Sequence, residues 1–243
     1  NFAQAGAFLV TLSARQPNGT ITTRSFVQAV YTTATTGAPR ASSAMALEPR
    51  AGAPTRLWVA NPDHGSVAVF DTTTSVRIGE VAVTTAGGSG GAAGTPRTVA
   101  VAPDGRIWVV NQGVSTISVV SPTTLATVQT IALPRASRPY GLVFAPDNSA
   151  AFVTLEATGQ LLKLSPTTGA TLATLAVGAN PRHVSITADS GRLLVSRFIS
   201  PPLPGEATAV VQTTVGGAPR GGEVLAVSPV TMTLQSTVVL RHS

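Results

Sequence analysis

The chain has 243 residues, of which 43% are hydrophobic, with a formal net charge of +6 and no cysteine. The absence of thiols excludes disulfides, thiolate metal sites, cysteine nucleophiles and covalent haem attachment within these residues. The positive charge does not predict nucleic-acid binding, because the arginines are spread singly along the chain, and no apolar run approaches the length of a membrane span.

Residues 1–31 predict a β-hairpin, because apolar residues alternate along a first strand and an Asn-Gly turn precedes a second strand. The segment resembles the closing strands of a PKD-type immunoglobulin-like domain. The resemblance is carried by Phe2, Gly6, Phe8, Val10, Leu12 and Gly19. It implies an immunoglobulin-like fragment and a natural protein that extends upstream. The alternative is an edge hairpin packed on the domain that follows.

Residues 32–54 are rich in Thr, Ala, Gly and Pro and predict a linker that leads into a first inner strand. From residue 43 the chain repeats itself. Turns centred on Asp104, Asp147 and Asp189 are 43 and 42 residues apart, which is the length of a four-stranded propeller blade. We interpret these aspartates as turn residues that bind backbone amides, not as paired acid–base groups.

The repeats predict an all-β fold, a β-propeller with about four four-stranded blades at 43–83, 97–133, 138–177 and 181–240. Large aromatic residues recur at one place in three units. Trp58, Trp108 and Phe152 have β-branched or apolar neighbours, so we expect them to pack between blades and not to form a cage for a cationic ligand.

The units resemble the YVTN family of bacterial β-propeller repeats. Its motifs appear as Pro96 with Pro103-Asp104-Gly105, Trp108-Val109-Val110-Asn111, and the run from Ile117 to Thr124. Propellers of this family usually close with six to eight blades. The resemblance therefore implies that these blades are part of a larger propeller in a longer polypeptide. A closed four-bladed ring and a pair of chains that completes an eight-bladed ring are the alternatives.

Two insertions interrupt the repeats, at 84–95 and 199–222. The first is glycine-rich but lacks the Gly-Lys-Ser/Thr of a phosphate loop, so it predicts a surface loop. The second begins Pro-rich, ends Gly-rich and predicts a protruding arm, a candidate partner contact. Its candidate contact residues are Pro201, Pro202, Leu203, Val210 and Val211.

Polar residues stand near the start of successive inner strands, at Arg97, Tyr140, Arg182 and His183. We predict that they surround one mouth of the central channel, where they would bind an anionic ligand or a partner's acidic loop. Solvated strand-entry residues are the alternative. We identify no catalytic set, metal site or cofactor, and His64 lies in a predicted surface turn.

Two function classes follow from this sequence. The favoured one is a non-catalytic, secreted or envelope-associated bacterial propeller, periplasmic or at the cell surface, that acts as a protein-binding or structural subunit of a larger protein or complex. Its partners are proteins or other domains of the same polypeptide, without nucleic acid. The alternative is the propeller portion of a bacterial enzyme, either lactonase-like or lyase-like, or accompanying a redox haem domain outside these residues.

Overall fold

The computed structural model describes residues 6–30, 42–83, 94–197, 214–215, 218–219 and 222–240. All regular structure in these ranges is β-strand. The same ranges contain no helix that is long and apolar enough to cross a membrane. The chain divides into two compact units, Asn1–Ala38 and Pro39–Ser243. Each unit is described by itself.

The first unit contains an antiparallel hairpin of β1 (Gly6–Arg15) and β2 (Ile21–Val30), paired along its full length. Gly19 has a φ of +87° in the turn, which glycine adopts without steric cost. The Thr20 amide donates to Asn18 Oδ1 at 3.0 Å, so the turn uses the asparagine side chain as well. The predicted hairpin is therefore present, and its PKD-type resemblance stays a prediction.

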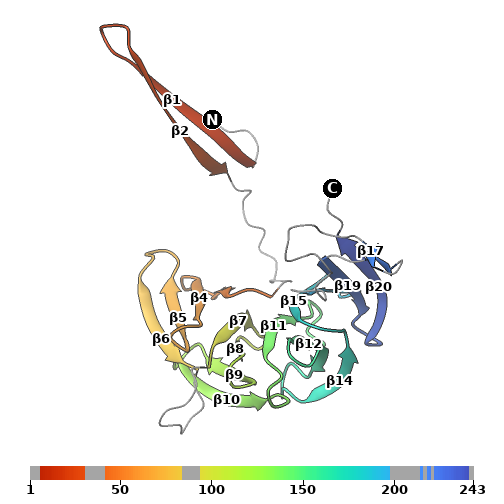
Figure 1. Ribbon diagram of the computed structural model, residues 1–243. Coiled ribbons are helices and arrows are strands. Elements are labelled where there is room, and N and C mark those ends of the chain that lie inside the picture. Colours follow the sequence, from red (N-terminus) through yellow and green to blue (C-terminus); the bar gives the residue numbers. More distant parts are fainter. Residues whose placement is uncertain are drawn as a thin grey trace. The chain divides into compact units, whose positions relative to one another are not determined.

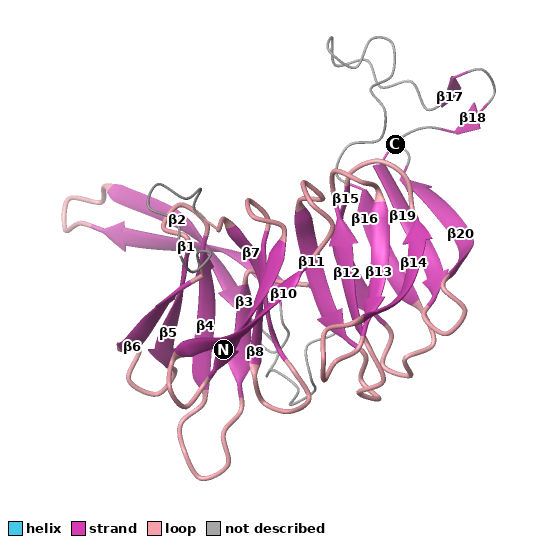
Figure 2. Ribbon diagram, turned by 90° about the horizontal axis from the view of Figure 1, so that it is seen from below, coloured by secondary structure: helices cyan, strands magenta, loops and turns pink. Residues whose placement is uncertain are grey.

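The second unit is built from four antiparallel sheets of four strands, each paired in chain order (Figures 1 and 2). We call these sheets blades 1 to 4. Blade 1 consists of β3 (Met45–Glu48), β4 (Arg56–Asn61), β5 (Ser66–Asp71) and β6 (Arg77–Ala82); blade 2 of β7 (Pro96–Val101), β8 (Ile107–Asn111), β9 (Thr116–Ser121) and β10 (Ala126–Ala132); blade 3 of β11 (Pro139–Phe144), β12 (Ala151–Leu155), β13 (Gln160–Leu164) and β14 (Thr171–Ala176); and blade 4 of β15 (Pro181–Ile186), β16 (Leu193–Arg197), β19 (Gly222–Ser228) and β20 (Thr233–Leu240).

The four blades confirm the predicted all-β propeller architecture. The inner strands β3, β7, β11 and β15 lie side by side in that order, and the other strands of each blade follow outward (Figure 1). The blades do not close into a ring, since the first and last blade each keep a sheet face that no other described blade covers.

Three apolar clusters fill the spaces between successive blades. Trp58, Trp108 and Phe152 each face the next blade and are at most 1% exposed, which confirms that they pack between blades. The Trp108 ring meets the Phe144 ring edge-on, with 5.1 Å between centroids. A single blade is apolar on both faces, so each face is buried only when a neighbour stacks on it.

Polar side chains also join the blades, and three of these bonds share one pattern, with the donor side chain in the earlier blade and a backbone carbonyl of the next blade as acceptor. These bonds run from Arg56 Nη1 to Pro122 O at 2.6 Å, from Arg106 Nη2 to Thr167 O at 3.0 Å, and from Lys163 Nζ to Pro229 O at 2.9 Å. The outer parts of blades 1 to 4 are therefore linked by side-chain to main-chain bonds.

The repeated aspartates serve the turns, as the repeat predicted. Asp104, Asp147 and Asp189 each accept a bond from the amide two residues later, at 3.0, 3.0 and 2.9 Å. The Ser149 and Thr187 hydroxyls, and then these amides, hold the pKa of Asp147 and Asp189 below the usual value. The three carboxylates therefore form hydrogen bonds within their own turns.

Parts of both predicted insertions lie outside the described residues. Of 84–95, only Gly94 and Thr95 are described. Within 199–222, β17 (Thr214–Val215) pairs with β18 (Ala218–Pro219), and Gly222 begins β19. The candidate contact residues of the arm all lie outside the described part of the chain: Pro201, Pro202, Leu203, Val210 and Val211.

Candidate functional site at the inner-strand entries

The strands β7, β11 and β15 each begin with a proline, and the chain bends sharply just before it. The preceding residue has a positive φ in all three blades, +48° at Thr95, +50° at Arg138 and +55° at Asn180. This conformation is uncommon for residues other than glycine, and proline disfavours helical conformations in the residue before it. Because the bend recurs in three blades, it belongs to the repeat and fixes how the chain enters each inner strand.

The second residue of each of these strands contributes to one cluster. Arg97, Tyr140 and Arg182 occupy this position in consecutive blades. The Tyr140 ring centroid lies 4.9 Å from Cζ of Arg182 and 5.9 Å from Cζ of Arg97, and the His183 ring meets it edge-on at 5.2 Å. The structure thus brings together the four residues predicted at the channel mouth, whose binding role remains a prediction.

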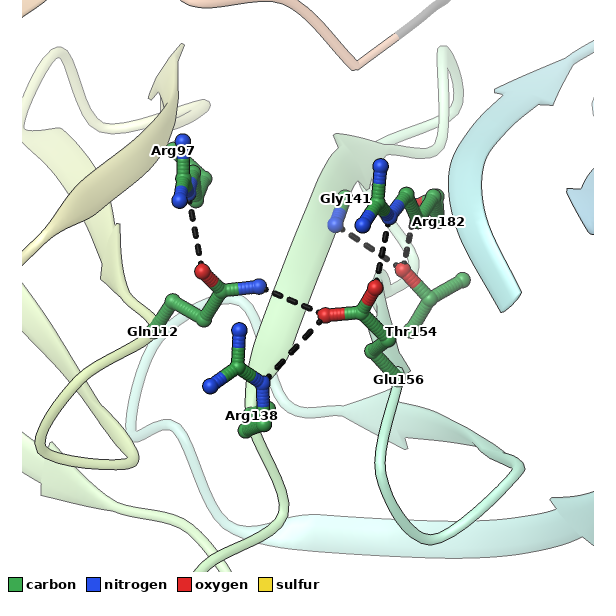
Figure 3. Close-up of polar contacts among 7 residues, drawn as sticks. All are labelled: Arg97, Gln112, Arg138, Gly141, Thr154, Glu156 and Arg182. Atoms are coloured by element: carbon green, nitrogen blue, oxygen red, sulfur yellow. Dashed lines mark hydrogen bonds and ion pairs between the residues drawn. The ribbon is translucent and has the colours of Figure 1, made fainter. Parts of the chain in front are cut away.

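Glu156, which directly follows β12, is the centre of the polar contacts (Figure 3). Its Oε1 accepts a bond from Arg182 Nε at 2.6 Å, and its Oε2 accepts one from Gln112 Nε2 at 2.7 Å. Arg138 Nε lies 3.5 Å from Oε2, and Gln112 Oε1 accepts from Arg97 Nε at 2.8 Å. Both Glu156 and Gln112 are buried. One carboxylate therefore links residues from blades 2, 3 and 4.

Beside this cluster, threonine hydroxyls donate hydrogen bonds to backbone carbonyls of the next inner strand and so connect neighbouring blades. Thr98 Oγ1 on β7 donates to Tyr140 O on β11 at 2.7 Å. The position equivalent to Thr98 in blade 3 is Gly141, and there Thr154 reaches across from β12 to donate to Arg182 O at 2.5 Å. Thr154 Oγ1 also accepts from the Gly141 amide at 2.8 Å. The absent side chain at Gly141 leaves room for this arrangement.

Ser42, which precedes β3, reaches the inner strand of blade 4. Its amide donates to Val184 O at 2.8 Å, and its Oγ accepts from the Val184 amide at 3.1 Å. Ser42 Oγ lies 3.3 Å from His183 Nδ1. The next residue, Ser43, accepts a bond from the Val99 amide of blade 2 at 2.9 Å. The segment that enters blade 1 therefore borders the cluster and contacts two other blades.

The cluster carries more positive than negative charge. Arg138 and Arg182 contact the single carboxylate of Glu156, and Arg97 is linked to it through Gln112, so two positive charges are in excess. Partial burial, and then the charge of Arg182, lower the pKa of His183, so its imidazole is neutral near pH 7. Side chains of this composition suit an anionic group, because guanidinium groups bind carboxylates and phosphates through charge-assisted bonds.

Sequence reasoning missed four members of this site, Gln112, Arg138, Glu156 and Ser42. A signal for two of them was available, because Gln112 and Glu156 each directly follow the second strand of their blade and are thus equivalent in the repeat. A glutamate at that place in a chain with few acidic residues marks a departure from the repeat. No sequence pattern pointed to Ser42, because its contacts depend on how close the segment before blade 1 lies to the inner strand of blade 4.

Other predicted positions lie away from this cluster. The His64 amide donates to Asn61 O at 3.2 Å in the turn after β4, as expected of a turn residue. In the ranges that the structure describes, no three His, Cys, Asp or Glu side chains gather closely enough to hold a metal ion.

Comparisons with known proteins support the fold alone. No protein-family model and no curated protein matches the sequence. Hydrazine synthase from Kuenenia stuttgartiensis is similar in structure over 76% of this chain and 46% of its own, with a TM-score of 0.60 and 21% identity. Virginiamycin B lyase from Staphylococcus aureus is similar over 100% of this chain and 69% of its own, with a TM-score of 0.61 and 12% identity. The dihydro-heme d1 dehydrogenase NirN is similar over 76% of this chain and 34% of its own, at 21% identity and a TM-score of 0.53. The neighbours' propellers are therefore similar in architecture to the blades described here.

Proposed function

We propose that this propeller is a non-catalytic binding module, a subunit of a larger protein or complex, that recognises an acidic segment of a protein partner at the inner-strand entries. The observation that supports this most directly is the gathering of three arginines beside one carboxylate. Arg138 and Arg182 contact Glu156, and Arg97 contacts Gln112, which is bonded to Glu156. The family resemblance favours a bacterial YVTN-type propeller behind a PKD-type fragment, in an extracytoplasmic location.

The arginines of the cluster are placed to accept a further anion. Arg97 uses its Nε for Gln112, and within the described residues no acceptor meets its terminal amino groups. The Arg138 side chain is 57% exposed and lies 3.5 Å from Glu156. An incoming carboxylate would thus find guanidinium donors that Gln112 and Glu156 orient but do not saturate. Because Arg138 and His183 are exposed, a protruding segment of a partner can reach them.

Fluorescence anisotropy with a labelled octaglutamate peptide tests this proposal. We expect binding that weakens as salt is raised, since the contacts are electrostatic. Arg97→Gln and Arg138→Gln should each weaken it about fivefold, equivalent to ~1 kcal/mol. Arg192→Gln, in the exposed turn between β15 and β16, removes the same charge outside the cluster and should leave binding unchanged. If Arg192→Gln weakens binding as much, the site is not the inner-strand entries.

A second candidate is the propeller portion of an enzyme, and one contact favours it. Ser42 Oγ lies 3.3 Å from Nδ1 of the neutral His183, an arrangement seen where a histidine acts as a base toward a hydroxyl. The names of the structural neighbours include a lyase and a lactonase. Turnover of simple lactones or of quinupristin, lost in both Ser42→Ala and His183→Ala, would favour this candidate. A visible absorption spectrum of the purified protein tests the association with haem.

A further inference from the structure

His183 borders the arginine cluster and, among the described side chains there, it is the one whose charge changes between about pH 5 and 8. It is the third residue of β15, a position that Thr98 occupies on β7 and Gly141 on β11. The His183 ring is exposed, and it meets the Tyr140 ring edge-on with 5.2 Å between centroids. Cζ of Arg182 lies 4.9 Å from the centroid of the same tyrosine. A titrating group therefore stands beside the guanidinium groups that we propose bind an anion.

The contact of His183 with Ser42 allows the imidazole to be neutral or protonated. Ser42 Oγ lies 3.3 Å from Nδ1 of His183 and accepts a bond from the Val184 amide at 3.1 Å. A hydroxyl has one donor hydrogen and two acceptor lone pairs. It can therefore donate to the neutral imidazole, and it can use its second lone pair to accept from Nδ1–H of the imidazolium. Because neither charge state leaves Nδ1 without a partner, protonation does not require the inner strands to separate.

The surroundings of His183 disfavour its charged form unless an anion is present. The strands β11, β12 and β16 pack against β15. At the end where β15 begins, charged side chains on or beside these strands form ion pairs, Arg138 and Arg182 with Glu156, and Arg197 with Glu223. Tyr140 on β11 and Ser42 before β3 also contact the ring, and neither is charged near pH 7. Burial, and then the Arg182 charge, lower the pKa of His183. An anion bound to the arginines would offset this repulsion and favour the imidazolium.

These contacts couple the charge of His183 to an anion at the cluster. With a neutral imidazole the arginines exceed the carboxylate of Glu156 by two positive charges, and the imidazolium raises the excess to three. We propose that protonation of His183 regulates this site, so that an acidic segment of a protein partner binds more tightly as the pH falls below 7. The inference rests on the proposed function, since the acidic segment has to bind at the inner-strand entries. By reciprocity, the bound segment also favours the uptake of a proton by His183.

His64 provides a matched comparison for His183. It is exposed in the turn after β4, where its amide donates to Asn61 O at 3.2 Å. It belongs to blade 1, whereas the arginines of the cluster belong to blades 2, 3 and 4 or directly precede their inner strands. A pH effect that acts through the net charge of the protein would involve both histidines. An effect that acts through the anion site would involve His183.

Fluorescence anisotropy with labelled octaglutamate at pH 8.0 and at pH 5.5 tests this regulation. The dissociation constant of the wild type should be about threefold lower at the lower pH, because one added charge near the bound carboxylates contributes at most about fivefold. His183→Gln should lose this difference, and His64→Gln should retain it. Affinity that does not change with pH in the wild type, or a change that His183→Gln retains, would overturn the inference and leave the proposed function in place. No binding at either pH would overturn both.

NMR titration of the His183 ring gives a second test, which needs no substitution. Saturating octaglutamate should raise the pKa of His183, because the bound carboxylates stabilise the imidazolium. Linkage fixes the size of the rise, since a limiting affinity ratio of about fivefold corresponds to a pKa increase of about 0.7. The ring signals of His64 should not respond to the peptide. A His183 pKa that is unchanged or lower with the peptide bound would contradict the proposed regulation.

Discussion

Gly141 and Arg182 approach each other backbone to backbone across the boundary between blades 3 and 4. A Cβ atom at Gly141 would lie 2.3 Å from Arg182 O, and 3.1 Å from both Ser42 Oγ and Thr154 Oγ1. The close packing of the inner strands therefore depends on the missing side chain, since a carbonyl on a paired strand has little freedom to move.

Gly141→Ala should lower the free energy of unfolding by about 1–3 kcal/mol, the usual cost of forcing atoms into a packed site. Urea denaturation measures this. Gly79→Ala is the matched control, because its Cβ would meet only the end of the Leu125 side chain, at 2.6 Å, and that side chain can rotate away. Equal losses in the two variants would show that the inner-strand contact is not rigid.

Glu156→Ala should destabilise the protein by about 3 kcal/mol, because it leaves the partly buried Arg182 guanidinium and the buried Gln112 amide without their shared acceptor. Glu156→Gln keeps the shape but loses the charge and should fall between the wild type and the alanine variant. The control is Arg77→Ala, which breaks the exposed pair with Glu80 and leaves the bond between Glu80 and the buried Ser66 in place. We expect its unfolding midpoint to stay close to that of the wild type.

The two interblade tryptophans should respond differently to substitution by phenylalanine. Trp58 Nε1 donates to the buried Glu48 at 2.7 Å, whereas Trp108 Nε1 has no hydrogen-bond partner within the described residues. Trp58→Phe leaves a buried carboxylate oxygen without its donor and should cost about 1–3 kcal/mol more than Trp108→Phe. Chemical denaturation of the two variants measures the difference, and a larger loss for Trp108→Phe would contradict it.

His183 should make stability depend on pH in a defined direction. Burial and Arg182 lower its pKa in the folded state below 6.5, the value of an unperturbed histidine. Between the two values the unfolded chain binds more protons, so stability falls as the pH drops below about 6.5 and stops falling below the folded pKa. His183→Gln should flatten this part of the curve. NMR titration of the His183 ring, in the wild type and in Arg182→Gln, should show a rise in pKa when the arginine charge is removed.

The sequence predicted the blades and the approach of Arg97, Tyr140 and Arg182 because both follow from the repeat. A fixed spacing of 42 or 43 residues returns each residue to the same place on the next inner strand. The two tryptophans and Phe152 are 50 and 44 residues apart, and they were predictable from the strand motif that recurs around them. Whatever the repeat preserves can be located by counting along the chain.

The network around Glu156 was not predictable in this way, because it consists of departures from the repeat. Glu156 stands where blade 2 has Gln112, and Gly141 stands where blade 2 has Thr98. Each of these residues forms its contacts with a residue of a neighbouring blade. The distance between the two residues depends on how the blades stack, which the repeat spacing does not give. The contact of Ser42 with His183 likewise joins residues 141 positions apart.

The bonds between the outer parts of the blades have a consequence for how such a chain evolves. In each one, the side chain of Arg56, Arg106 or Lys163 binds a main-chain oxygen, which the next blade supplies whatever its own side chains are. A blade can therefore accept a new neighbour without a compensating substitution in that neighbour. Duplication or loss of a whole unit in the gene would preserve these junctions, so the number of blades can drift while their stacking is inherited.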